Sequence, residues 1–245
     1  MNLKEFIKSL KGFDENSPYF ADFYLLFNRI ISDIETSPKK NNKHKVIMIT
    51  SAMEKEGKST LASLASVTGA IASKDYHLLV DGDLRKPTLH KQFDVKLGSG
   101  LSDILKNGTC LSSVVRPTSH KSLHLITAGK HVDKPFELLS SDKVNRLFDD
   151  LRKYYKLVII DSPPVIPVSD ALKFGPICDG VVIIVKAGKT PRDIVKRAID
   201  IVKQNQCQLL GVVLNDVGGV LPYYYHRKYY KSSYHYSNYV VRKKK

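Results

Sequence analysis

From Lys45 onward, short apolar runs alternate with longer segments in which polar and apolar residues are mixed. The short runs predict six strands, at residues 45–50, 77–80, 123–127, 156–160, 180–186 and 209–215. They are apolar almost throughout, as strands covered on both faces must be. Residues 58–73, 137–154 and 192–206 have the spacing of helices. This alternation predicts an α/β fold: a mostly parallel central sheet with helices on both faces.

The chain before the first strand has a different pattern. Residues 3–10 and 20–35 predict two helices, and a polar linker follows them. Apolar residues recur at helical spacing in the second helix, which can therefore pack either on the body of the protein or on a partner. We predict three parts: an N-terminal helical segment and linker (1–44), an α/β domain (45–220) and a C-terminal tail (221–245).

The tail is basic and rich in tyrosine. The chain has 39 basic and 24 acidic residues, a net charge of +15, and seven of the basic residues lie in residues 221–245, where no acid occurs. Such a charge attracts polyanions, whether nucleic acid, acidic lipid or acidic polymer. Aromatic rings between bases would also suit single-stranded nucleic acid. No RNA-binding signature accompanies them, so we expect no specific nucleic acid as a partner. Without hydrophobic periodicity, the tail is predicted to be disordered.

The cysteines and the longest apolar runs bear on location. Cys110, Cys178 and Cys207 are far apart and form no CxxC pair, which indicates a reducing compartment and free, buried thiols. No apolar run approaches the roughly 20 residues of a membrane span, and the N-terminus lacks the core of a signal peptide. We expect a cytoplasmic protein that another molecule would have to hold at a membrane.

The first strand leads into ITSAMEKEGKSTLASL, where Gly57, Lys58, Ser59 and Thr60 open a helix. This is the setting of a phosphate-binding loop (P-loop), although Ala52 replaces the first glycine of GxxxxGK[ST]. Backbone N–H groups at the helix N-terminus bind phosphate oxygens, the lysine neutralises charge, and the serine hydroxyl can ligate Mg²⁺. The motif predicts nucleotide binding.

Acidic residues follow two other strands. Asp81 and Asp83 lie in LLVDGDLRKP, and Asp161 lies in KLVIIDSPP. Because ligands bind beyond the carboxyl ends of the strands in such sheets, these residues and the P-loop should meet at one edge as a Mg²⁺–nucleotide site. An NKxD-like guanine signature is missing, which favours ATP. Asn215 ends the last strand and either reads an adenine edge or only terminates the strand.

These motifs resemble those of the bacterial tyrosine kinases (BY-kinases) of exopolysaccharide and capsule synthesis, which share a deviant P-loop NTPase fold with the MinD and ParA ATPases. SAMEKEGKST is similar to their Walker A motif, LLVDGDLRKP to Walker A′ and VIIDSPPV to Walker B. KPFELLSS is similar to their PNPxELLxS segment, and the tail to their autophosphorylation cluster. The resemblance spans residues 45–240 and identifies residues 45–220 as a kinase domain.

The resemblance implies roles for individual residues, with ATP and Mg²⁺ as cofactors. Lys58 would contact the β- and γ-phosphates, and Thr60 the α-phosphate. Ser59 would bind Mg²⁺, and Asp83 and Asp161 would hold the metal or its waters. Asp81 would orient and deprotonate the attacking tyrosine. The catalytic set is Lys58, Asp81, Asp83 and Asp161, and the nucleotide-binding set is Glu56, Gly57, Lys58, Ser59, Thr60, Arg85 and Asn215.

The resemblance also implies a substrate and partners. The protein would be an autokinase that regulates polysaccharide polymerisation and export. A transmembrane adaptor of the polysaccharide-copolymerase type would activate it and keep it peripheral at the inner face of the plasma membrane. A cognate tyrosine phosphatase and a homo-oligomer are further expectations. The acceptors would be Tyr223, Tyr224, Tyr225, Tyr229, Tyr230, Tyr234, Tyr236 and Tyr239.

The sequence departs from the family pattern at two places. Lys55 stands where a second P-loop glycine is usual, and it can either perturb the loop or contact a phosphate. The ExxRxxR motif of ring assembly would fall near Ala21, Tyr24 and Phe27 and does not match, which leaves ring formation open. The alternative class is a ParA/MinD-like positioning ATPase that binds DNA or membrane. The lysine typical of that class is absent, since Met53 occupies its position.

Overall fold

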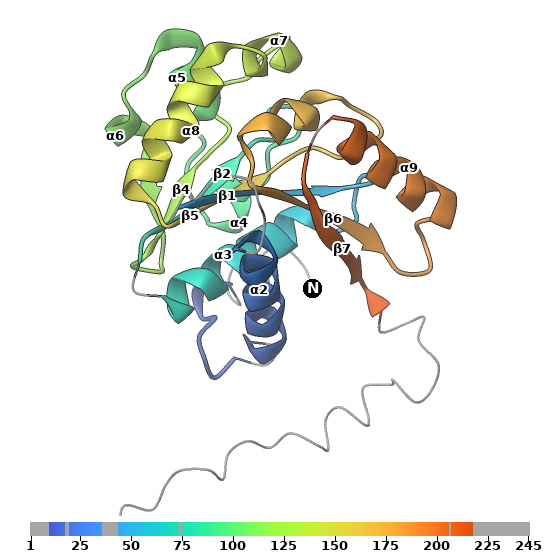
Figure 1. Ribbon diagram of the computed structural model, residues 1–245. Coiled ribbons are helices and arrows are strands. Elements are labelled where there is room, and N and C mark those ends of the chain that lie inside the picture. Colours follow the sequence, from blue (N-terminus) through green and yellow to red (C-terminus); the bar gives the residue numbers. More distant parts are fainter. Residues whose placement is uncertain (1–9, 18–19, 36–43, 74, 206, 218–245) are drawn as a thin grey trace, which may run out of the picture.

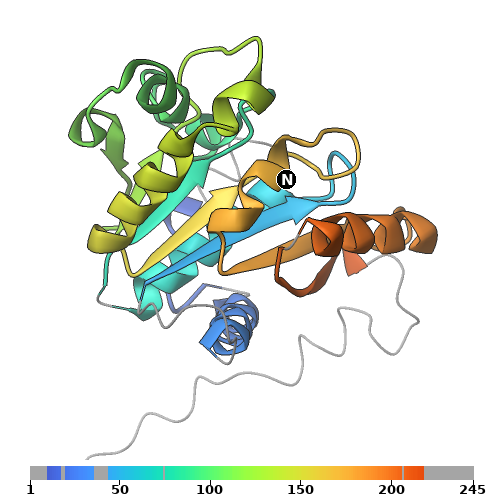
Figure 2. The same ribbon diagram turned by 45° about the horizontal axis from the view of Figure 1, so that its top comes forward.

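The computed structural model describes residues 10–17, 20–35, 44–73, 75–205 and 207–217. They contain a seven-stranded sheet with the strand order β3-β4-β2-β5-β1-β6-β7 (Figures 1 and 2). All neighbouring strands are parallel except β3 and β4. The predicted mostly parallel sheet is therefore confirmed. The strands are β1 (Lys45–Ser51), β2 (His77–Asp81), β3 (Val115–Pro117), β4 (Leu123–Ile126), β5 (Leu157–Asp161), β6 (Gly180–Lys186) and β7 (Leu209–Asn215).

Helices cover both faces of this sheet, as Figure 2 shows. On one face lie α2 (Phe20–Glu35), α3 (Lys58–Ala72) and the short α4 (Leu89–Gln92). On the other lie α5 (Leu101–Asn107), α6 (Leu111–Val114), α7 (Pro135–Leu139), α8 (Asp142–Tyr154), α9 (Arg192–Gln204) and the 3₁₀ helices η1 (Asp170–Lys173) and η2 (Gly175–Ile177). The predicted layering of helix, sheet and helix is confirmed.

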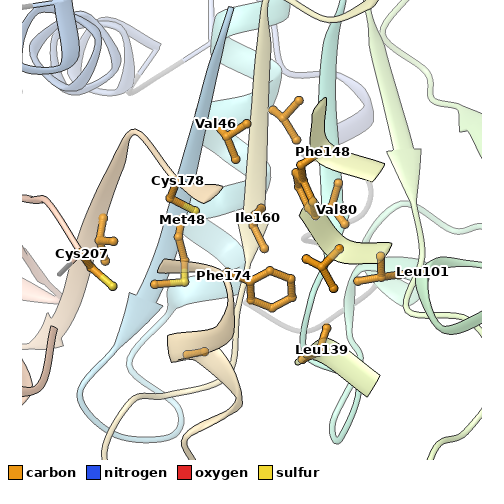
Figure 3. Close-up of a cluster of buried hydrophobic side chains, with 14 of the residues drawn as sticks. Val46, Met48, Val80, Leu101, Leu139, Phe148, Ile160, Phe174, Cys178 and Cys207 are labelled. Atoms are coloured by element: carbon orange, nitrogen blue, oxygen red, sulfur yellow. The ribbon is translucent and has the colours of Figure 1, made fainter. Parts of the chain in front are cut away.

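The strands divide their side chains between two cores. In β1, Val46 and Met48 belong to the core under α8 and α9, whereas Ile47 and Ile49 belong to the core under α2 and α3. This alternation follows from the two-residue period of a strand. Figure 3 shows the first of these cores, with Phe174 between the sheet and the helices that cover it. The continuous apolar runs are explained because each strand needs apolar residues on both faces.

The N-terminal helix α2 has the predicted bounds and packs on the body of the protein. Phe27, Ile30 and Ile34 are buried against α3. Of the two expected positions, on the body of the protein or on a partner, the structure shows the first. The predicted helix at residues 3–10 lies almost wholly outside the described residues. Most of the linker and the whole tyrosine-rich tail also lie outside them.

The prediction of one helix over residues 137–154 is wrong in one respect, because the structure has two helices there, α7 and α8. Ser141 has an extended backbone (φ −82°, ψ 150°) at the N-terminal boundary of α8. Before it, the Ser140 hydroxyl donates to the Phe136 carbonyl at 2.6 Å. Serine hydroxyls compete for backbone hydrogen bonds in this way and favour helix ends. The adjacent pair therefore separates two helices that apolar spacing alone merges.

Two expectations about burial are also wrong. Strand β7 lies at the sheet edge, and its Val212 and Leu214 are 39% and 53% exposed, so helices do not cover both of its faces. Cys178 and Cys207 are buried, as predicted, but Cys110 is exposed. No helix in the described part of the chain combines the length and apolarity that crossing a membrane requires.

Candidate active site

The P-loop joins the end of β1 to the first turn of α3. Gly57 has a left-handed backbone (φ 98°), and no side chain caps the helix that begins at Lys58. The first N–H groups of α3 therefore remain available to an anion, and the helix dipole favours negative charge there. Lys55 also has a left-handed backbone, with φ 63°. This residue thus keeps the conformation that glycine adopts without strain.

The Lys58 ammonium group lies among carboxylates from two other strand ends. Its Nζ is 3.0 Å from Asp83 Oδ2, 3.6 Å from Asp161 Oδ1 and 3.3 Å from Ser59 Oγ. Burial, the largest single effect, lowers the pKa of Lys58, but the charges of Asp161, Asp83 and Asp81 together raise this pKa above 10.5. Lys58 is therefore a permanent positive charge at the helix N-terminus.

Asp81 and Asp161 are paired in register at the ends of β2 and β5, and both are fully buried. Asp81 Oδ2 accepts hydrogen bonds from the backbone N–H groups of Thr88 (3.2 Å) and Leu89 (3.1 Å). Burial, reinforced by the charge of Asp161, raises the pKa of Asp81 well above 3.8. Burial also raises the pKa of Asp161 to about 6, a rise that the charge of Lys58 limits. Both carboxyl groups therefore keep a proton up to a higher pH than an exposed aspartate does.

A cavity of about 560 Å³ opens beside these residues. The P-loop contributes Glu54, Lys55 and residues 57–60, and the loop after β2 contributes Asp83, Arg85, Lys86 and Thr88. The remaining wall consists of Gln92 and four apolar residues after β5: Pro163, Pro164, Pro167 and Val168. The lining of the cavity therefore combines charged and apolar residues.

Arg85 is held at this cavity by an aspartate that no motif contains. Its guanidinium donates to both carboxylate oxygens of Asp170, at 2.5 and 3.1 Å. Asp170 is buried in η1, eighty-five positions along the chain from Arg85. A bidentate pair fixes the plane of the guanidinium as well as its position. Sequence reasoning missed Asp170, because VSDALKF contains no motif.

Behind the P-loop, Glu56 connects three parts of the chain. Its buried carboxylate accepts hydrogen bonds from the Met53 backbone N–H (2.8 Å) and from the Thr190 hydroxyl. The Glu56 carbonyl accepts a hydrogen bond from Asn215 Nδ2 at 2.8 Å. Thr190 Oγ1 in turn accepts the Lys186 backbone N–H at 3.0 Å. Glu56 and Asn215 therefore support the loop from behind, and Thr190 is a further supporting residue that the sequence did not reveal.

The carboxylates fit a divalent cation only together with other ligands. Asp161 Oδ1 and Oδ2 and Asp81 Oδ1 are buried oxygens without a hydrogen-bond partner among the described residues. In the same part of the chain, no three acidic, histidine or cysteine side chains have the spacing of a metal site. Mg²⁺ commonly takes one or two carboxylates and completes its shell with phosphate oxygens and water. The arrangement suits that mode of binding, with the Ser59 hydroxyl beside it.

The structure thus brings most of the predicted site residues together. Ser59, Asp83 and Asp161 each have an oxygen within 3.6 Å of Lys58 Nζ. Lys58, Ser59 and Asp83 line the cavity together with Gly57, Thr60 and Arg85. Asp81 and Asp161 are fully buried beside these residues and do not line the cavity. The eight predicted acceptor tyrosines lie outside the described residues, and their use as acceptors stays a prediction.

A P-loop that opens a helix, with carboxylates from neighbouring strand ends around its lysine, defines a P-loop NTPase. No family model matches the chain. The chain is 36% identical over 203 residues to a Staphylococcus aureus protein named "Putative tyrosine-protein kinase CapB". The matched residues span 81% of this chain and 88% of CapB. It is also 36% identical to the tyrosine-protein kinase YwqD of Bacillus subtilis over 171 residues, which span 70% of this chain and 72% of YwqD. The chain belongs to the bacterial tyrosine kinases.

Solved structures agree with this assignment. The chimerical protein CapA2B2 matches 81% of this chain and 85% of its own, with a TM-score of 0.73 and 35% identity. The septum site-determining protein MinD of Pyrococcus horikoshii matches 70% of each chain with a TM-score of 0.57 and 19% identity. The latter likeness shows a shared fold alone. The predicted kinase family is therefore confirmed, and the ParA/MinD-like alternative is supported only by the fold.

Proposed function

We propose that the protein is an ATP-dependent autokinase that transfers the γ-phosphoryl group of ATP to tyrosines of its own C-terminal tail. The observation that carries this proposal is the position of Lys58, whose ammonium group lies beside Asp83 and Asp161 at the N-terminus of α3. This arrangement offers positive charge and free N–H groups to a triphosphate, with carboxylates next to them. Family membership supplies the tyrosine as acceptor.

In this proposal, each residue near Lys58 has a separate task. Lys58 and the N–H groups of α3 bind the β- and γ-phosphates, and Thr60 binds the α-phosphate. Ser59, Asp83 and Asp161 would hold Mg²⁺, which would neutralise charge on the phosphates when bound. Arg85 adds a second positive charge, whose orientation Asp170 fixes. Asn215 supports the P-loop from the β7 side and keeps its proposed place near the base.

The transfer forms one bond and breaks another. The phenolic oxygen bonds to the γ-phosphorus, while the bond from that phosphorus to the β–γ bridging oxygen breaks and ADP leaves. The phenolic proton passes to a carboxylate, for which we propose Asp81. Because a free phenol has a pKa near 10, it has to lose its proton as the bond forms. Positioning and charge neutralisation supply most of the lowering of the barrier.

The same proposal places the kinase in capsule or exopolysaccharide synthesis, where it would regulate polymerisation and export. Its activator would be a transmembrane adaptor of the polysaccharide-copolymerase type, which would hold the kinase at the inner face of the plasma membrane. A tyrosine phosphatase would reverse the modification, and self-association is part of the proposal. These partners follow from the family resemblance.

Phosphorylation would reverse the charge of the tail. Its seven basic residues give a formal charge of +7, and each phosphate adds about −1.5 to −2 at pH 7. Eight phosphates would therefore make the tail strongly negative. We propose that this reversal releases the tail from an acidic neighbour. Equal self-association and equal adaptor affinity of the two forms would contradict this proposal.

Mass spectrometry of the full chain after incubation with Mg²⁺ and ATP tests the kinase function, both with and without the adaptor. We expect phosphate on several of the eight tail tyrosines. Lys58→Met should abolish it, and Lys203→Met, on α9 away from the cavity, should leave it unchanged. A tail that stays unmodified with the adaptor present would refute the proposal. ATP hydrolysis stimulated by DNA or lipid, without phosphotyrosine, would support the ParA/MinD-like alternative.

A further inference from the structure

The apolar residues that line the cavity have no part in the phosphate chemistry described above. Pro163, Pro164, Pro167 and Val168 follow β5 directly and face the same space as Lys58 and Asp83. A triphosphate is charged and hydrated, and an apolar surface offers it neither hydrogen bonds nor opposite charge. These four residues, which we call the proline wall, therefore fit a different part of the reaction.

The beginning of the proline wall is held in place by hydrogen bonds to β1. The Thr50 hydroxyl donates to the Pro163 carbonyl at 2.8 Å, and the Val165 backbone N–H donates to the Ser51 carbonyl at 2.9 Å. Val165 and Phe174, on either side of Val168, are buried in the core that Figure 3 shows. Proline also has a restricted backbone. A binding surface that is already rigid loses little conformational entropy when a ligand binds to it.

The position of the proline wall in the sheet separates it from the expected base of the nucleotide. The lining of the cavity comes from the loops after β1, β2 and β5 and from α3 and α4. Asn215, the candidate residue for the base, lies at the end of β7, and β6 separates that strand from β1. The proline wall is therefore on the γ-phosphate side of the P-loop, where an acceptor has to enter.

We propose that the proline wall is the acceptor subsite, which seats the phenol ring of the tyrosine to be phosphorylated while its hydroxyl faces Lys58 and the aspartates around it. This inference rests on the proposed kinase function. A tyrosine side chain is apolar over its ring and polar at its tip, and the cavity lining offers both kinds of surface: three prolines and Val168 after β5, and charged residues after β1 and β2. In this orientation the phenolic oxygen attacks the γ-phosphorus and the ring stays out of water.

Val168 offers the cleanest test, because it is half-buried and its side chain can be changed without altering the prolines. Val168→Ser should raise KM for a synthetic peptide of residues 232–238 about tenfold, the usual effect of losing one or two apolar carbons from a pocket. Val168→Leu, which stays apolar, should keep KM within about threefold of the wild-type value. Val115→Ser, a half-buried valine on β3 at the far edge of the sheet, is the matched control and should leave KM unchanged.

Nucleotide affinity, measured in parallel with a fluorescent ATP analogue, distinguishes the acceptor from the base. We expect Val168→Ser to leave this affinity unchanged. A loss of ATP affinity equal to the rise in KM would mean that the proline wall seats the base, and it would overturn the inference. An unchanged KM for the peptide would overturn it as well.

A photocrosslinking experiment on the full chain needs no turnover. The same peptide, with benzoylphenylalanine in place of one tyrosine, should crosslink to residues 163–168, and crosslinks found only elsewhere would refute the acceptor subsite. Crosslinks at residues 163–168 in a protein that never forms phosphotyrosine would refute the kinase function and keep the subsite. Phosphotyrosine on the tail without these crosslinks would keep the kinase function and refute the acceptor subsite.

Discussion

The side-chain amide of Asn215 lies directly against the backbone of Gly57. Its Nδ2 donates to the Glu56 carbonyl at 2.8 Å and is 2.2 Å from the point that a β-carbon on Gly57 would occupy. Because Asn215 is the last residue of β7, the end of the sheet and the turn of the P-loop are in contact. Gly57 is therefore required for two separate reasons: its left-handed backbone and the space that Asn215 fills.

Gly57→Ala should lower the free energy of unfolding by about 2–3 kcal/mol, with about 1 kcal/mol from the backbone strain and the rest from displacing Asn215. ATP affinity should fall at least about tenfold, because the first N–H groups of α3 would move. Urea unfolding and nucleotide titration measure the two effects. Gly108→Ala is the matched control: Gly108 is also left-handed, with φ 68°, but a β-carbon there meets nothing within 4 Å. Equal losses of stability for both variants would show that Asn215 adds no constraint.

Lys55→Gly should raise the free energy of unfolding slightly, by less than about 1 kcal/mol. Lys55 has φ 63°, where a side chain costs roughly 1–2 kcal/mol, and the greater freedom of glycine in the unfolded chain offsets part of the gain. Lys55→Ala removes the charge but keeps the strain, so it should bring no gain. Thermal unfolding of the three proteins measures the difference. If ATP affinity falls equally in both variants, the Lys55 ammonium group contacts a phosphate.

The sequence predicted the elements that repeat a simple pattern and missed those that depend on distant residues. Strands β6 and β7 have the predicted bounds, because their apolar runs end at polar residues. Strand β3 was missed, because Val-Arg-Pro has no apolar run and only its pairing with β4 makes it a strand. The exposure of Val212 was also missed, because neighbours across the sheet, and not local sequence, set the burial of a strand.

The candidate site divides in the same way. Lys58, Asp83 and Asp161 could be predicted to meet, because parallel strands end at one edge and motifs mark their ends. Asp170 and Thr190 could not, because each contacts a site residue far away in sequence and stands in a segment without a motif. Pro167 and Val168 likewise could not be assigned to the site from the sequence, because only the folded structure shows the cavity that they line.

The buried carboxyl group of Asp161 should make stability depend on pH in an unusual direction. Burial raises its folded pKa to about 6 from 3.8. Between these values the folded state holds more protons than the unfolded state, so this group lowers stability as pH rises from about 4 to about 6 and has a constant effect above that. Asp161→Asn lacks this effect, so its stability relative to wild type should increase over the same interval.

Urea unfolding at several pH values between 4 and 8 measures this difference. Asp149→Asn makes the same chemical change at an exposed position of α8 and is the control. A stability difference between Asp161→Asn and wild type that stays constant from pH 4 to pH 8 would show that Asp161 titrates at an ordinary pKa.

Thr190→Val should destabilise the protein by about 2 kcal/mol and weaken ATP binding. The Thr190 hydroxyl donates to the buried carboxylate of Glu56 and accepts a hydrogen bond from the backbone N–H of Lys186. Valine has a similar volume but no hydroxyl, so it leaves both the carboxylate and the N–H without this partner. Because Glu56 also binds the Met53 N–H, loss of its second partner frees the P-loop to change shape. Urea unfolding and nucleotide titration give the two magnitudes. Thr190→Ser keeps the hydroxyl and loses only a methyl group, so it should retain most of both properties. If serine were as damaging as valine, packing of that methyl group, and not the hydrogen bond to Glu56, would hold the loop in place.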